Sequence, residues 1–224
     1  MDARTFLTKS GRATVEAAVA EAERTTAAEF VCAVATESGR YDRAESLVGL
    51  VIAVLGLTYL HLASNWVPAS SWSGSRGVAL AEAAAVVVLG FVAGSVLASV
   101  WRTLRRPFIG QAEIDGEVAR AADHVFAACR LTTTRQRGGV LLYLSLFERR
   151  VVVLADTGAM AALGPDGIAA LRDLAVERLR AGKSVETFTE TITTAARRLA
   201  GALPPAAVDR DELPNAVFVF HPRP

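Results

Sequence analysis

The sequence predicts an α/β sandwich domain that is interrupted by a two-helix transmembrane hairpin. In the outer parts of the chain, short β-rich apolar runs alternate with stretches of helical periodicity, which is typical of helices packed on a small mixed sheet. The middle part is apolar almost throughout. Residues 46–75 contain no charged side chain, and Glu82 is the only charged residue in 77–101.

Two segments of this middle part, residues 47–63 and 79–101, are long enough to cross a bilayer. At about 1.5 Å per residue, a helix of this length reaches close to the roughly 30 Å of a hydrocarbon core. Neither segment carries the polar stripe that a helix in a soluble core usually keeps. We therefore predict two spans joined by a short connector over Ser64–Arg76, with the lipid bilayer as a partner.

The hairpin of residues 46–101 divides the rest of the chain into residues 1–45 and 102–203, with a Pro-rich C-terminal tail over 204–224. A piece of 45 residues is too short to bury a core of its own. We therefore predict that the two outer pieces fold together as one domain, into which the hairpin is inserted.

The second predicted span contains Gly90 and Gly94 in a G-x-x-x-G pattern, and the first has Gly49 four residues before Ala53. Small residues at this spacing let membrane helices approach closely. The pattern predicts packing of the two spans on each other. A homodimer through Gly90 and Gly94, or contact with another membrane protein, is the alternative.

The distribution of arginine around the spans predicts the orientation in the membrane. One arginine lies in the connector, and five lie beside the spans on the domain side: Arg40, Arg43, Arg102, Arg105 and Arg106. Positive charge near span ends favours the cytoplasmic side. We therefore expect an inner (plasma) membrane protein with both termini and the soluble domain in the cytoplasm. Cys32 and Cys129 fit free thiols in a reducing compartment.

The elements of the soluble domain follow from local patterns. An amphipathic helix is expected around Val15–Ala22, after the capping candidates Thr8 and Ser10. Continuous apolar runs indicate three strands, the last two forming a hairpin buried on both faces. Further helices are expected from about Ile114 to Arg130, from Pro165 to Gly182 and from Ser184 to Leu199; the strand ranges are 30–35, 139–145 and 149–155.

Charge and motif content exclude several function classes. The chain has 24 Lys and Arg against 23 Asp and Glu, without a basic stripe, so we expect no nucleic-acid binding. The sequence has no P-loop, C-x-x-C, H-E-x-x-H or G-x-G-x-x-G motif, and no Ser-His-Asp or Cys-His set is apparent.

Two motifs resemble the TPM domain. The first is Glu23-x-x-Thr26-x-x-Glu29 before a strand, and the second is Thr134-x-x-Arg137-x-Gly139-Val140-Leu141-Leu142-Tyr143, followed by Glu148-Arg149 and Asp156-x-Gly158. The match covers nearly the whole chain outside the hairpin. The resemblance implies a Rossmann-like sandwich, found in bacterial membrane-associated proteins and in a thylakoid-lumen protein linked to photosystem II repair. It also implies that acid phosphatase activity or binding of a divalent metal such as calcium occurs among relatives. The sequence departs from many relatives in its inserted hairpin and predicted cytoplasmic domain.

A candidate site follows from the strand order without the family. If strands 30–35 and 139–145 are parallel, their starts and the end of strand 149–155 meet at one edge of the sheet. Glu29, Thr134, Arg137 and Asp156 would then converge. Two carboxylates, a hydroxyl and a guanidinium suit a hard cation, calcium or magnesium, or a phosphate. The alternative is a structural ion pair between Arg137 and Asp156, with Glu29 solvated.

Three functions follow from these observations. The first is a membrane-anchored, non-catalytic binding or assembly module that contacts a partner protein near the bilayer. The second is a divalent-metal-assisted phosphatase, in which Glu29 and Asp156 hold the ion, Arg137 orients phosphate, and Asp156 and Arg137 are the catalytic candidates. The third rests on Asp156-Thr157-Gly158, which matches the catalytic loop of aspartic proteases.

Overall fold

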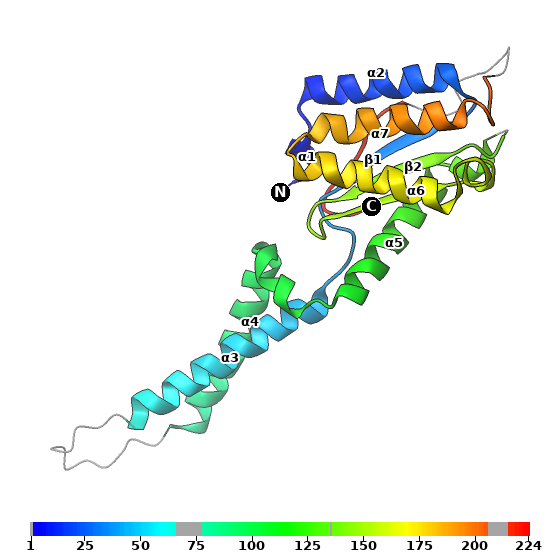
Figure 1. Cartoon of the computed structure of the whole chain (residues 1–224). Helices are drawn as coiled ribbons and strands as arrows, with labels where there is room; N and C mark the ends of the chain where they lie inside the picture. The colour runs from blue at the N-terminus through cyan, green and yellow to red at the C-terminus, as the bar shows by residue number, and fades with distance from the viewer. Residues whose placement is uncertain (1, 66–77, 135, 206–214) are drawn as a thin grey trace, which may run out of the picture. The chain divides into compact units, whose positions relative to one another are not determined.

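The structure is a computed structural model that describes residues 2–65, 78–134, 136–205 and 215–224. It divides into two compact units. The α/β unit comprises Met1–Gly39 and Ile114–Pro224, and the hairpin unit comprises Arg40–Glu113 (Figure 1). Most of the predicted connector, including Arg76, and residues 206–214 of the predicted tail lie outside the described residues.

The α/β unit contains a four-stranded mixed sheet in the order β3-β2-β1-β4. Strand β1 (Phe30–Ala35) is parallel to β2 (Val140–Ser145) and to β4 (Phe218–Phe220), whereas β2 is antiparallel to β3 (Arg150–Ala155). The mixed α/β class and the β2–β3 hairpin are therefore as predicted, and the parallel β1–β2 pair meets the condition on which the candidate site depends. Strand β4 was not predicted, because its three residues lie within the segment interpreted as a Pro-rich tail.

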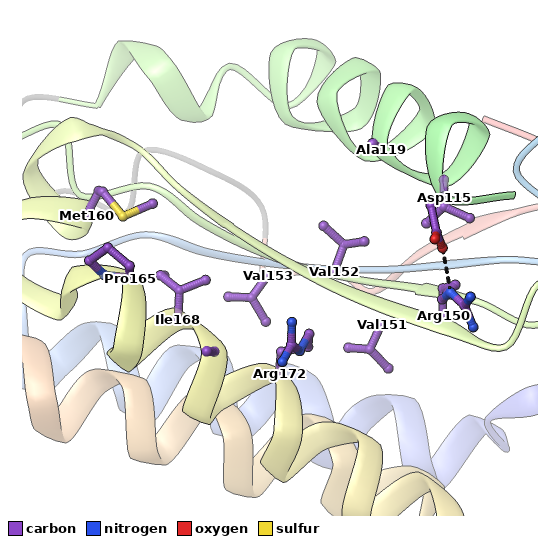
Figure 2. A pocket seen from close by; sticks show the side chains of 12 residues that line it. Asp115, Ala119, Arg150, Val151, Val152, Val153, Met160, Pro165, Ile168 and Arg172 are labelled. Carbon is purple, nitrogen blue, oxygen red and sulfur yellow. Dashed lines mark hydrogen bonds and ion pairs between the residues drawn. The ribbon is translucent and has the colours of Figure 1, made fainter. Parts of the chain in front are cut away.

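Helices cover both faces of the sheet. On one face, α2 (Lys9–Thr25), α6 (Thr157–Arg180) and α7 (Ser184–Leu199) share a hydrophobic core with alternate residues of β1, β2 and β3 (Figure 1). Helix α5 (Gln111–Ala128) lies on the other side of β3 from α6 (Figure 2). Short helices α1 (Ala3–Phe6) and η2 (Leu131–Thr133) complete the unit.

Burial of the strands follows their place in the sheet. All six residues of β2 are buried, as predicted. In β3 only Val151 and Val153 are buried, so the prediction that this strand is covered on both faces is wrong. The buried residues Val151 and Val153 belong to the face that shares a core with α6 and α7, whereas Val152 and Leu154 on the other face are only half-buried.

Helix boundaries agree with the predicted caps in one case and differ in another. The Thr8 hydroxyl accepts a hydrogen bond from Gly11 N at 3.0 Å and so caps α2. Helix α6 begins at Thr157, earlier than predicted, and is interrupted at Gly164, whose φ of 67° glycine adopts readily. The helix predicted from Pro165 is therefore the second part of α6.

The hairpin unit contains α3 (Asp42–Asn65), α4 (Leu80–Val100) and the 3₁₀ segment η1 (Arg102–Phe108). The two long helices pack through their small residues. A Cβ atom added to Gly94 would lie 2.8 Å from the Cα of Gly49, and one added to Gly90 would lie 3.0 Å from the Cα of Ala53. The G-x-x-x-G residues thus lie against α3 within the same chain.

Both long helices are apolar and long enough to cross a membrane. Only 17% and 11% of their most apolar windows are buried within the protein. A helix of a soluble core would be mostly buried, so these helices instead present their apolar side chains at the surface.

At the base of the hairpin unit, Arg105 NH1 of η1 and Glu45 Oε1 of α3 form an ion pair at 2.8 Å. The Arg105 side chain is only 4% exposed. A buried pair of this kind costs several kcal/mol when one partner is removed, and it joins the start of α3 to the segment after α4.

Candidate functional site at the sheet edge

The structure brings three of the predicted site residues to one edge of the sheet. Val140 N donates to Glu29 O at 2.8 Å, and Asp156 N donates to Gly139 O at 2.8 Å. The starts of β1 and β2 and the end of β3 therefore meet there. Thr134 belongs to the loop that enters β2, since its hydroxyl accepts from Gly138 N at 3.1 Å. Glu29, Thr134 and Asp156 are all buried.

Asp156 is the N-cap residue of α6. Its Oδ1 accepts a hydrogen bond from Thr157 N at 2.7 Å, and its carbonyl accepts from Met160 N at 2.7 Å. Aspartate is among the favoured residues at this position because its carboxylate satisfies amides that the helix leaves unpaired. The carboxylate thus has a structural task.

The glycine of the Asp-Thr-Gly stretch also has a local explanation. A Cβ atom at Gly158 would lie 2.3 Å from Gln136 O, a backbone atom that cannot move aside cheaply. Capping by Asp156 and the close approach at Gly158 together account for the residues that match the aspartic protease loop.

Arg137 contributes its backbone to this edge. It has a left-handed conformation, with φ of 53°, and its carbonyl accepts from Gly158 N at 2.9 Å and from Ala159 N at 3.1 Å. Its side chain is exposed. Within the described residues no ion pair joins Arg137 to Asp156, so the structural ion pair weighed as an alternative is not formed. This backbone role has no sequence signature.

These contacts occupy the N-terminus of α6. The amides of Thr157, Gly158, Ala159 and Met160 all donate to protein acceptors. A helix N-terminus binds phosphate when such amides point outward. At α6 they are already used, so this terminus is not an open phosphate site.

The predicted site also contains a buried carboxylate oxygen that remains unsatisfied. The Oδ2 atom of Asp156 is buried and has no hydrogen-bond partner in the described structure. A buried carboxylate oxygen of this kind fits a cation, and Glu29 supplies a second carboxylate at the same edge. Among the described residues, however, no group of three or more His, Cys, Asp or Glu is arranged to hold a metal ion.

A second cluster of buried polar residues, which sequence reasoning missed, lies at the opposite end of the strands, beyond the carboxyl ends of β1 and β2. Glu148 accepts hydrogen bonds from Ser38 N at 2.9 Å and from the Ser145 hydroxyl. The Ser38 hydroxyl also contacts Tyr143 Oη at 2.8 Å and donates to Ser145 Oγ at 2.7 Å. Burial raises the pKa of Tyr143 to about 12. The signal available in the sequence was the position of Ser38, Ser145 and Glu148 at or just after strand ends.

This end of the strands is also covered by the chain after β4. Glu37 N donates to Pro222 O at 3.0 Å, and Arg223 NH1 donates to Gly39 O at 3.2 Å. Arg223 also lies 3.6 Å from Glu37 Oε1. In open α/β sheets, ligands usually bind beyond the carboxyl ends of the strands. Here that position holds an internal hydrogen-bond network and the returning C-terminal segment.

A cavity of about 620 Å³ lies elsewhere, along β3 between α5 and α6 (Figure 2). Its walls are mainly aliphatic, with an ion pair between Asp115 and Arg150 at 2.8 Å near one end. Met160 and Pro165 lie near the other end (Figure 2). This cavity is therefore distinct from both carboxylate clusters.

The fold defines the class of this protein: an α/β domain with an apolar helical hairpin inserted between its first and second strands. The chain is similar in fold to the BA42 protein from the psychrophilic bacterium Bizionia argentinensis, whose structure was solved by NMR. The TM-score is 0.57 at 16% identity, and the match covers 95% of this chain and 94% of that chain. At this identity the similarity shows the fold alone. No family model and no curated protein matches the sequence.

Proposed function

We propose that the protein is a membrane-anchored, TPM-like module that binds a partner protein near the bilayer and does not catalyse a reaction. The observation that carries this proposal is the combination of an exposed apolar hairpin with an α/β unit whose site residues serve the fold. Asp156 and Arg137 both provide acceptors for α6, and Glu148 holds the loop after β1. The TPM-like motif residues at the edge of the sheet support a Rossmann-like sandwich.

The proposal includes the orientation of the chain. The hairpin spans the inner membrane, and the α/β unit with both termini lies in the cytoplasm. Support comes from the excess of arginine beside the two apolar helices, which includes three in η1. Glu82, in the first turn of α4, then lies near the outer interface, where its carboxylate reaches water.

A divalent-metal-assisted phosphatase is the second candidate, favoured by the buried, unsatisfied Oδ2 of Asp156. Glu29 and Asp156 would hold calcium or magnesium, which supplies Lewis-acid stabilisation of charge on phosphate oxygens. The exposed guanidinium of Arg137 would orient the phosphate. In this case Asp156 would combine capping through Oδ1 with ligation through Oδ2.

One assay separates the two candidates. The full chain in detergent or nanodiscs is incubated with p-nitrophenyl phosphate and millimolar calcium or magnesium, beside Asp156→Asn. We expect no hydrolysis that depends on Asp156. Turnover that disappears in Asp156→Asn would overturn the non-catalytic proposal and support the phosphatase.

A further inference from the structure

Strand β3 leaves one side of its backbone unpaired. It is the terminal strand in the order β3-β2-β1-β4, and its only partner in the described sheet is β2. The directions of its backbone groups follow from the register. Asp156 N bonds to Gly139 O, and these two residues are opposite each other when the β2–β3 register is extended by one.

Because hydrogen-bonded pairs alternate along an antiparallel ladder, Leu154, Val152 and Arg150 also face β2. Val151 and Val153 therefore direct their N–H and C=O groups away from the sheet. These two residues line the cavity of about 620 Å³. The open backbone edge thus faces into a groove.

The walls of the groove fit a single added strand. Small and aliphatic residues of α5 and α6, among them Ala119 and Ile168, flank the edge on its two sides (Figure 2). An extended chain alternates its side chains between the two faces of a sheet. A strand placed beside β3 would therefore direct apolar side chains toward α5 and α6 in turn.

The charged residues of the groove indicate where an added strand would carry an acidic side chain. Arg150 and Arg172 line the groove together with one acid, Asp115. The ion pairs of Arg150 with Asp115 and of Arg172 with Asp173 are solvent-exposed. A carboxylate of the incoming segment can therefore replace either aspartate at little cost. Arg150 is the first residue of β3, and in an antiparallel pair it lies beside the C-terminal end of the added strand.

We propose that the groove along β3 binds an extended, mainly apolar segment of a partner protein by antiparallel strand addition, with an acidic residue near the C-terminal end of that segment. This inference rests on the proposed binding function and names its site. A second copy of this chain fits less well. Helices α5 and α6 flank β3, and in a pairing of two β3 strands they would collide with the same helices of the other copy. A single extended segment carries no such helices.

Proline at position 153 tests the inference directly. Val153→Pro removes an outward N–H that bonds to no neighbouring strand, and proline is accepted at such edge positions. Val153→Thr is the matched control, because it keeps the N–H. Ala119→Trp fills the groove from an exposed position of α5, and Ala127→Trp places the same side chain on an exposed position of α5 that does not line the groove.

The full chain in nanodiscs is screened against a phage-displayed library of random twelve-residue peptides. We expect enriched peptides with alternating apolar residues and an acid near the C-terminal end. They should bind the wild type, Val153→Thr and Ala127→Trp, and bind Val153→Pro and Ala119→Trp about tenfold or more weakly, the effect of losing about 1.4 kcal/mol. In the wild type, the bound peptide should slow hydrogen exchange at the amides of Val151 and Val153.

The inference is overturned if no peptide is enriched, or if the enriched peptides bind both groove variants as well as the wild type. Concentration-dependent dimerisation of the wild type that is lost in Val153→Pro would also overturn it, because the occupant would then be a second copy. These failures are distinct from failure of the proposed function, which is decided by phosphomonoester hydrolysis in the separate assay.

Discussion

Replacing Asp156 by alanine and by asparagine separates its capping role from a role of its charge. In Asp156→Ala the hydrogen bond from Thr157 N at 2.7 Å is lost at a position that is only 6% exposed. Loss of a cap costs about 1 kcal/mol, and a buried unsatisfied amide raises the cost to about 1–3 kcal/mol. At roughly 2–4 °C per kcal/mol for a domain of this size, Tm should fall by about 2–12 °C.

Asparagine should behave differently, because its side-chain oxygen caps a helix about as well as that of aspartate. We expect Asp156→Asn to unfold near the wild-type temperature when thermal unfolding of the full chain is followed by circular dichroism in detergent. Equal losses in the two variants would refute the capping argument. A rise in wild-type Tm with millimolar calcium or magnesium that disappears in Asp156→Asn would instead indicate a cation held by this carboxylate.

Three further predictions concern other parts of the chain. Gly158→Ala should destabilise the α/β unit by about 2 kcal/mol or more because its Cβ meets Gln136 O, whereas Gly116→Ala, which meets nothing within 4 Å, should be neutral or stabilising in denaturant unfolding. Burial raises the pKa of Tyr143 from 10.0 to about 12, so its contribution to stability is present below pH 10 and is lost as the pH rises toward 12. Tyr143→Phe should flatten this part of the pH–stability curve. An unchanged curve would contradict the raised pKa of Tyr143. Glu45→Ala should cost about 3 kcal/mol because it removes a charged acceptor of the buried Arg105. Glu21→Ala, at an exposed pair with Arg24, should cost under about 1 kcal/mol; similar losses would refute the distinction.

Local patterns in the sequence were sufficient for most elements of the fold. The predicted run Phe30–Ala35 coincides with β1, because continuous apolar residues suit a strand covered on both faces. The cap of α2, Thr8, is likewise one of the two candidates, Thr8 and Ser10, that precede the amphipathic stretch. The placement of Glu29 and Asp156 at the same end of the sheet followed from strand directions alone. These are features that periodicity and chain connectivity determine.

Features that depend on long-range contacts were not predictable in this way. Strand β4 has only three residues, and it pairs with β1 across most of the length of the chain. The hydrogen bond from Ser38 N to Glu148 joins residues 110 positions apart, and no local sequence pattern predicts it. Asp156 was interpreted for its chemistry, whereas its position directly before α6 gives it a capping role. Helical periodicity in the sequence is clear only from Pro165 onward, so it does not reveal this position.

The central claim, a hairpin that crosses the inner membrane with the α/β unit in the cytoplasm, is tested most directly by labelling the connector. Ser71→Cys places a thiol between the two apolar helices, and a membrane-impermeant maleimide is added to intact cells. The native thiols are internal controls, because burial raises the pKa of Cys32 and Cys129 and both are expected on the cytoplasmic side. The account predicts labelling that depends on Ser71→Cys before lysis. Labelling of this variant only after lysis would contradict the orientation and the cytoplasmic assignment together.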